Sequence, residues 1–193
     1  MNELYPIFLK TDQLNLLIVG GGKVALEKLT FLLKSSPNSV VTLVSIAFIP
    51  EVRKIIEQYD FEFHLKEYSE EDLEKRNIVI GATNDEKVNR QIYQDAKKRN
   101  LLVNIADNPP LCDFYMGGIV TKGNLKLAIS TNGKSPTMAK RLRQYFEEFL
   151  PENIDDLLQN INQYRKELKN DFEFKVNELN NLTKSIIQKS HEI

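Results

Sequence analysis

Short runs of apolar residues alternate with helical stretches along the first half of the chain. Four of these runs lack the polar alternation of a half-exposed strand: residues 16–19, 40–44, 77–82 and 101–106. Apolar strands joined by helices are typical of a parallel sheet that is covered on both faces. The spacing predicts helices over 23–34, 50–59 and 86–98, and a further short strand at 61–65. We therefore predict an α/β fold with a Rossmann-type doubly wound parallel sheet over residues 1–113.

The pattern changes after residue 110. Residues 117–131 are expected to form a hairpin that turns at Gly123-Asn124. Ser135 is a suitable N-cap and Pro136 a suitable first residue for the next helix, which Pro151 interrupts. Beyond that proline, apolar residues recur at helical spacing. We predict three parts: a nucleotide-binding domain (1–113), a small hairpin-plus-helix segment (114–150) and a helical C-terminal domain (151–193).

Composition narrows the range of partners. The 193 residues carry a formal net charge of −1 and are 41% hydrophobic, as in an ordinary globular protein. A balanced charge gives no reason to expect nucleic acid or an anionic membrane as a partner, and no apolar run approaches the roughly 20 residues of a membrane span. The single cysteine, Cys112, excludes an internal disulfide and fits a reducing compartment. Because the N-terminus lacks the pattern of a signal peptide, we expect a cytoplasmic protein.

The first strand ends at three glycines, and residues 20–25 read Gly-Gly-Gly-Lys-Val-Ala, which fits G-x-G-x-x-A. In that pattern Gly20 allows the tight turn, Gly22 lets a pyrophosphate approach the backbone, and Ala25 allows close helix–strand packing. The position between the first strand and its helix favours dinucleotide binding over a purely structural turn. The second strand ends at Val44-Ser45-Ile46-Ala47 without the usual acid for a ribose, so this rule does not separate NAD from NADP.

A second signal is electrostatic. From Phe114 to Phe146 there is no Asp or Glu, yet the stretch contains six basic residues: Lys122, Lys126, Lys134, Lys140, Arg141 and Arg143. Each of them alone is most simply a solvated surface residue. As a group beside the turn Ser130–Pro136 they favour an anion site, for a polycarboxylate or a phosphate rather than for DNA.

Two polar residues follow buried strands, where open α/β sheets place ligands. Asp107 follows the strand at 101–106, where its carboxylate is suited to general base catalysis or to orienting a cationic group. Turn chemistry explains Asp107-Asn108-Pro109 equally well. Thr83 follows the strand at 77–82 and either lines the cofactor cleft or caps the next helix.

Taken together, these motifs resemble a known family. LYPIFLKTDQLNLLIVGGGKVALEKLTFLL, GATNDEKVN, VNIADNPPLCDF and AISTNGKSPTMAKRLR occur in that order, and they are similar to the precorrin-2 dehydrogenases of siroheme biosynthesis. These occur as separate enzymes and as the N-terminal part of siroheme synthases. The resemblance runs from about Tyr5 to Arg143. It implies an NAD-dependent oxidation of precorrin-2 to sirohydrochlorin by a homodimer that assembles through the segment after the nucleotide domain.

The resemblance also implies roles for individual residues. Asp107 matches the important active-site acid of the family, acting in proton abstraction or in binding a pyrrole N–H. Cofactor contacts carry over to positions after the glycines and after the second strand: Lys23, Val24, Ile46 and Ala47, with Ser45 beside them and Thr83 across the cleft. The loop expected to contact the substrate falls on Ser130, Thr131, Gly133 and Ser135, with Lys134 and Arg141 facing the substrate's carboxylates.

Two alternatives remain open from the sequence. Some relatives also insert iron into sirohydrochlorin, but here His64 and His191 stand apart and Cys112 with Asp113 is too sparse for a metal site, so we predict no metal ligands. The other alternative is a non-catalytic module that senses NAD. Such modules usually carry an acid at the end of the second strand, which this chain lacks.

Overall fold

The structure is a computed structural model that describes residues 2–169 and 172–188. It contains two compact units. The first runs to Gly118 and includes Ser130–Ala139, and the second comprises Ile119–Ile129 and the chain from Lys140 onward. The three-part division expected from the sequence stays a prediction.

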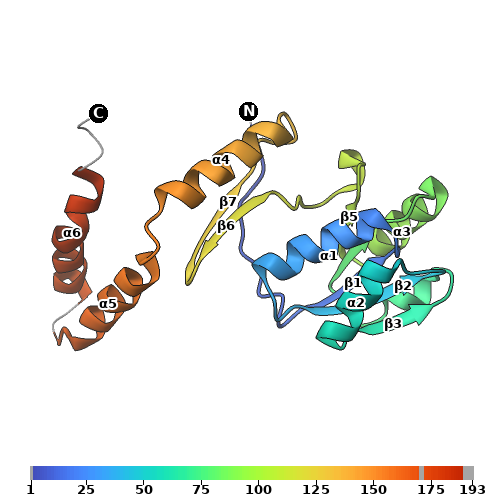
Figure 1. The fold of residues 1–193 in the computed structure, drawn as a ribbon, viewed down its shortest axis with the longest axis horizontal. Coiled ribbons are helices and arrows are strands. Elements are labelled where there is room, and N and C mark those ends of the chain that lie inside the picture. The colour runs from blue at the N-terminus through green and yellow to red at the C-terminus, as the bar shows by residue number, and fades with distance from the viewer. Residues whose placement is uncertain (1, 170–171, 189–193) are drawn as a thin grey trace. The chain divides into compact units, whose positions relative to one another are not determined.

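A five-stranded parallel sheet forms the centre of the first unit (Figure 1). Its strands are β1 (Asn15–Val19), β2 (Val40–Ser45), β3 (Glu62–Leu65), β4 (Ile78–Gly81) and β5 (Leu102–Ile105). They lie in the order β3-β2-β1-β4-β5, so the chain builds outward from β1 in one direction and then in the other. At the end of β1, Val19 pairs with Val44 on one side and with Gly81 on the other. The predicted doubly wound parallel sheet is confirmed.

Helices cover both faces of this sheet. On one face α1 (Lys23–Ser35) and α2 (Pro50–Tyr59) bury Leu29 and Val52 against Ile18 of β1. On the other face α3 (Glu86–Lys98) and the short 3-10 helix η1 (Glu70–Leu73) bury Ile92 and Leu73 against Val79. A second 3-10 turn, η2 (Pro109–Leu111), follows β5. Burial on both faces explains why the strands read as uninterrupted apolar runs.

Local sequence signals account for several of the boundaries. Pro50 supplies the fixed φ of a first helical residue in α2. Asp85 caps α3 by accepting the backbone N–H groups of Lys87 and Val88. Ser69 and Asp72 form a reciprocal capping box around η1. These caps satisfy N–H groups that the first turn of a helix leaves without a partner.

A hairpin of β6 (Gly118–Lys122) and β7 (Leu125–Ile129) leads into the second unit, and it turns at Gly123-Asn124 as predicted. Gly123 has φ +54° in this turn. The carboxylate of Asp155 accepts the backbone N–H of Asn124 at 2.6 Å and its side-chain amide at 2.8 Å. Lys122 donates to the carbonyl of Leu150 at 2.6 Å. The hairpin is therefore tied to the start of α5.

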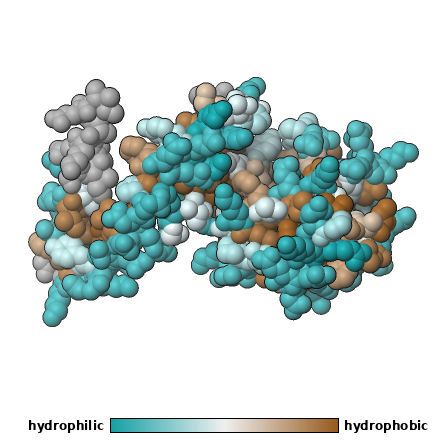
Figure 2. Space-filling model, in the orientation of Figure 1, coloured by the Kyte–Doolittle hydropathy of each residue, from teal (hydrophilic) through white to brown (hydrophobic). Residues whose placement is uncertain are grey.

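The remaining helices are α4 (Pro136–Phe149), α5 (Ile154–Glu167) and α6 (Phe172–Gln188). Within the described part of the chain, α4 and α5 contain no buried residue. Figure 2 shows hydrophobic residues open to view on the C-terminal helices. Among the described helices, none is long and apolar enough to cross a membrane.

Candidate functional site

The glycine turn after β1 is constrained by the neighbouring strands. Gly20 has φ +130°, and its N–H donates to the carbonyl of Val44 at 2.8 Å. A Cβ at this position would lie 2.3 Å from the carbonyl oxygen of Ala82. Only glycine adopts this backbone conformation without strain and leaves room for the chain that follows β4. Gly20 therefore sits at the point where the order of the strands reverses.

Gly21 and Gly22 differ in their surroundings. A Cβ on Gly21 would lie 2.0 Å from the carbonyl oxygen of Ala47, and the N–H of Ile49 donates to the carbonyl of Gly21 at 2.9 Å. Gly21 thus joins the glycine turn to the loop between β2 and α2. A Cβ on Gly22 would meet nothing within 4 Å. Open space at the start of α1 therefore lies at Gly22, where the sequence pattern predicts a pyrophosphate.

Lys23 and Val24 begin α1 directly after this open space. The Lys23 side chain is exposed, while Val24 is half-buried against the core of the first unit. Ala25 is fully buried in that core, as the small third position of the motif requires. Because Gly22 is the N-cap residue and has no side chain to cap the helix, the N–H groups of the first turn are suited to receiving an anion.

The loop after β2 uses its hydroxyl internally. Ser45 Oγ donates to the carbonyl of Ala47 at 2.8 Å, and the carbonyl of Ser45 accepts the N–H of Lys66 at 3.1 Å. Ile46 is 74% exposed, and Ala47 is exposed beside it. The loop therefore presents an apolar residue where many nucleotide-binding sheets present an acid.

Thr83 lies at the end of β4. Its hydroxyl is 2.8 Å from Asn89 Oδ1 and 3.1 Å from the carbonyl of Asp85. Asn89 also donates to the carbonyl of Thr83 at 2.9 Å. These bonds shape the entry into α3, although Asp85 rather than Thr83 caps that helix. The backbone N of Thr83 would lie 3.3 Å from a Cβ on Gly20, so the ends of β1 and β4 meet at these two residues.

Asp107 occupies a turn directly after β5. The N–H of Asn108 donates to the carbonyl of Ile105 at 3.2 Å, and Asp107 has φ +58° in this turn. Its side chain is exposed, and no hydrogen bond to its carboxylate occurs among residues 2–169 and 172–188. Asp85 and Asp113, in contrast, accept backbone N–H groups. The carboxylate of Asp107 is therefore not used within its turn, while its left-handed backbone is typical of Asp in a turn, and its role in the site stays a prediction.

The loop predicted to bind the substrate is tightly organised. The N–H of Lys134 donates to the carbonyl of Thr131 at 3.0 Å across Asn132 and Gly133, which have φ values of +52° and +71°. The Thr131 hydroxyl donates to the carbonyl of Ser135 at 3.1 Å and accepts its N–H at 3.2 Å. Thr131 therefore closes the loop from within.

The two serines of this loop also bond to its backbone. Ser135 Oγ accepts the N–H of Met138 at 3.1 Å, which confirms the predicted N-cap of α4. Ser130 Oγ accepts the N–H of Asn132 at 3.2 Å. A Cβ on Gly133 would meet nothing within 4 Å, so the tip of the turn is open.

Acids that follow the acid-free stretch neutralise part of its charge. Lys122 pairs with Glu152 at 2.7 Å, and Arg143 pairs with Glu147 one helical turn further along α4. Arg141 donates to the amide oxygen of Gln144 at 3.0 Å. Lys134 and Arg141 form no ion pair with another described residue. Lys134 and Arg141 are therefore more available to bind an anion than Lys122 or Arg143.

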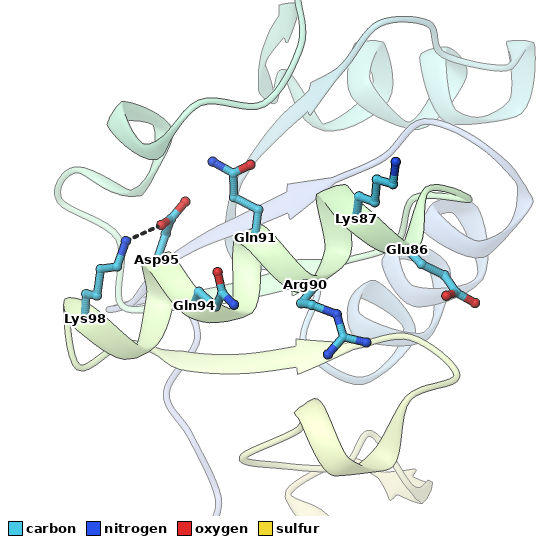
Figure 3. Close-up of a pocket in the computed structure, with 7 residues that line it drawn as sticks. All are labelled: Glu86, Lys87, Arg90, Gln91, Gln94, Asp95 and Lys98. Carbon is cyan, nitrogen blue, oxygen red and sulfur yellow. Dashed lines mark hydrogen bonds and ion pairs between the residues drawn. The ribbon is translucent and has the colours of Figure 1, made fainter.

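One depression in the described surface lies away from the predicted site residues. A shallow depression runs along α3, lined by Glu86, Lys87, Arg90, Gln91, Gln94, Asp95 and Lys98 (Figure 3). Within it Lys98 pairs with the buried Asp95 at 3.0 Å. None of the predicted site residues lines this depression. Among the described residues, no group of three His, Cys, Asp or Glu side chains is arranged to hold a metal ion.

Comparisons with known proteins match both parts of the chain. The sequence model of a family described as putative NAD(P)-binding matches residues 7–118, and that of the sirohaem biosynthesis protein central family matches residues 122–148. Curated relatives include the siroheme synthases of Pseudoalteromonas atlantica and Zymomonas mobilis, each 34% identical over 167 residues, or 86% of this chain. The chain spans only 36% and 35% of the length of these two relatives.

A solved structure matches most of the fold. It is described as SirC, precorrin-2 dehydrogenase, and it is 25% identical to this chain with a TM-score of 0.76. The match covers 93% of this chain and 89% of that one. Sheet, hairpin and C-terminal helices thus recur together in a protein of similar length.

Proposed function

The chain belongs to the putative NAD(P)-binding family, and we propose that it oxidises precorrin-2 to sirohydrochlorin with NAD⁺. Its motifs resemble those of siroheme synthases and precorrin-2 dehydrogenases. The observation that carries this proposal is the position of Asp107. Its carboxylate, which has no hydrogen bond or ion pair with a described residue, follows β5 at the same end of the sheet as the glycine turn after β1. The likeness to a precorrin-2 dehydrogenase over 93% of the chain supports the same substrate.

The proposed reaction removes a hydride and a proton from the reduced tetrapyrrole. When bound, NAD⁺ supplies the acceptor for the hydride. The N–H groups at the start of α1, beside the open space at Gly22, hold the pyrophosphate. The loop Ser45–Ala47 lies against the glycine turn and contacts the adenosine ribose. Asp107 takes the proton at its exposed carboxylate or orients a pyrrole N–H.

The substrate's carboxylates give the basic stretch its proposed purpose. Precorrin-2 carries eight of them, and Lys134 and Arg141 have no ion pair with a described residue. The rigid turn Thr131–Ser135 presents Lys134 and the open backbone of Gly133. We place the carboxylates of the ring against these groups, where bonds from cations to carboxylates are stronger than neutral ones.

We also propose that the chain works as a cytoplasmic homodimer. An apolar stripe on α4 supports the dimer: Met138, Leu142, Tyr145 and Phe149 are between 36% and 63% exposed and recur at the spacing of one helical face. The rings of Tyr145 and Phe149 stack at 5.8 Å within this stripe. A second copy of the same helix offers a matching surface. Sedimentation at several concentrations tests the dimer, and a species that stays monomeric contradicts it.

The deciding experiment is anaerobic. Purified protein is mixed with enzymatically generated precorrin-2 and NAD⁺, and NADH and sirohydrochlorin are followed by absorbance. We expect both to appear together. Protein that binds NAD⁺ but forms no NADH from intact substrate overturns the proposal and favours an NAD-sensing module. Addition of Fe²⁺ to the same cuvette then tests the ferrochelatase alternative.

The residue-level test is Asp107→Asn. Asn removes the acid but tolerates a positive φ, so this variant separates chemistry from backbone strain better than Asp107→Ala. We expect turnover to fall about 100-fold or more, the usual range for loss of a general acid or base. NAD⁺ affinity and the melting temperature should stay unchanged. Full turnover in Asp107→Asn removes Asp107 from the mechanism.

A further inference from the structure

The side chain of Cys112 bonds the turn that presents Asp107. Cys112 Sγ lies 3.2 Å from the carbonyl oxygen of Ile105 and 3.3 Å from that of Asn108. These carbonyls stand two residues before Asp107 and one residue after it. A single thiol therefore spans the turn from both sides, and its one proton is shared between two acceptors.

The state of the thiol suits this role. Cys112 is half-buried, and burial raises the pKa of its thiol above the ordinary value. A raised pKa keeps the sulfur protonated at neutral pH, so it remains a donor to carbonyl groups. A thiolate would instead repel both carbonyl oxygens and release the turn.

Asn104 supports the thiol from β5. Its side chain is buried, and its amide donates to the carbonyl of Phe114 at 2.8 Å and approaches Cys112 Sγ at 3.5 Å. Asn104 is paired with Ile80 in the register of β4 and β5. A polar residue in an otherwise apolar strand carries a desolvation cost. The contacts of Asn104 with Phe114 and Cys112 offset this cost. Both partners lie in the segment that follows the Asp107 turn.

The backbone of the turn sets the position from which the Asp107 carboxylate extends. Asp107 adopts a φ of +58°, which is uncommon for a residue with a side chain, although Asp tolerates it better than most. Its carboxylate has no hydrogen bond with a described residue that would fix its direction. A small movement of Ile105 or Asn108 would therefore move the acid directly.

We propose that Cys112 and Asn104 are positioning residues for Asp107: Cys112 holds the carbonyls on either side of its turn, and Asn104 holds Cys112. This inference rests on the proposed function, since it assigns a purpose to the direction of the acid. Misplacement of a reacting group by about 1 Å can reduce the rate about 100-fold. Two weak bonds around a tight turn are enough to set such a distance.

The test uses Cys112→Ala, which removes the donor, and Cys112→Ser, which keeps one. We expect Cys112→Ala to lower kcat about tenfold with the Kd for NAD⁺ unchanged, and Cys112→Ser to recover most of the loss. Lys97→Met is the matched control. It removes the 2.7 Å ion pair to Asp113, just beyond the loop, without touching the turn.

A double-mutant cycle separates positioning from general packing. In an Asp107→Asn background there is no acid left to position, so adding Cys112→Ala should change kcat less than twofold, while additive losses would overturn the inference. Asn104→Leu should behave like Cys112→Ala in the same cycle. Additivity in both cycles would show that the residues only pack.

Hydrogen exchange keeps this inference distinct from the proposed reaction. The Asn108 N–H closes the turn, and its exchange reports how often the turn opens. We expect Cys112→Ala to speed exchange at Asn108 about tenfold while the strands β1 and β4 keep their protection. If wild-type protein forms no NADH, the proposed function fails, but the exchange result still tests whether Cys112 holds the turn. Unchanged exchange at Asn108 in Cys112→Ala contradicts that role of Cys112 even where the dehydrogenase activity is present.

Discussion

The helices around the parallel sheet and the helices after the hairpin use their apolar residues differently. Four residues of α1 are buried within the chain, among them Leu29 and Leu33, which pack on the central strands. α4 is also amphipathic and of similar length, yet none of its residues is buried in the described structure. The first region completes its core by itself. The second presents an exposed apolar face, so we assign the proposed self-association to it and the proposed cofactor binding to the sheet.

The largest effect should come from the glycine turn. Gly21→Ala places a methyl group 2.0 Å from the Ala47 carbonyl oxygen, so the β2–α2 loop must move. We expect a loss of about 4 kcal/mol in the free energy of unfolding. Gly22→Ala is the matched control, because its methyl group meets nothing within 4 Å; it should change stability little while weakening NAD⁺ binding. Urea unfolding and NAD⁺ titration measure both, and equal destabilisation by the two variants would refute the assignment.

The next prediction compares one leucine from each region. Leu29→Ala empties a fully buried site in α1 and should cost about 3 kcal/mol of stability. Leu142→Ala removes a side chain that is 36% exposed on α4, and should cost under about 0.5 kcal/mol in the monomer. It should weaken self-association instead. Sedimentation beside thermal unfolding distinguishes the two responses, and a large monomer destabilisation by Leu142→Ala would contradict the comparison.

Charge reversal in the basic stretch should give a smaller effect. Lys134→Glu and Arg141→Glu each replace a cation proposed to face a substrate carboxylate. We expect KM for precorrin-2 to rise about fivefold, which is about 1 kcal/mol, and the difference to shrink at high salt. Lys122→Glu is not a matched control because Lys122 bonds Leu150 and Glu152. Lys87→Glu on α3 serves better. A KM that does not respond to either substitution would leave the stretch as a solvated surface.

The smallest effect concerns the hairpin. The N–H of Asn124 and the amide of Gln159 hold the pKa of Asp155 below its ordinary value of 3.8. A carboxyl whose pKa is lower in the folded state contributes stability above its unfolded pKa and loses it as pH falls through the folded value. The second unit should therefore weaken slightly below about pH 4, and Asp155→Asn should remove that dependence. Unfolding midpoints at pH 6 and pH 3 check this; an identical pH slope in the variant would speak against the bond.

Much of the fold was predictable because its signals are local. The helix at 86–98 was predicted with the bounds found in the structure, since Asp85 caps it directly. The turn at Gly123 followed from the glycine beside Asn124. The strands were recognisable because burial on both faces removes polar residues from them. Each of these signals lies within a few residues of the structure that it determines.

The site was less predictable because its contacts join distant segments. The sequence pattern assigned no constraint to Gly21, although a glycine at this unspecified middle position of the pattern was a signal that could have been used. Its role depends on Ala47, which lies 26 residues later in the numbering. The bond from Cys112 to the Asp107 turn was also invisible, since no spacing rule connects a thiol to backbone carbonyls. Likewise, the pairing of Arg143 with Glu147 reduced a charge bias that the acid-free stretch had overstated.

The left-handed backbone at Asp107 sets thermostability against the role that we propose for this acid. Glycine is the residue that this conformation accommodates without cost, whereas aspartate only tolerates it better than most others. A library at position 107 sorted for heat resistance alone would therefore enrich Gly and discard the native acid. With the role proposed for Asp107, selection of that kind would raise stability while it removes the function, a common trade-off in proteins. Engineering of this protein for high temperatures should keep position 107 fixed and seek its gains in the helices instead.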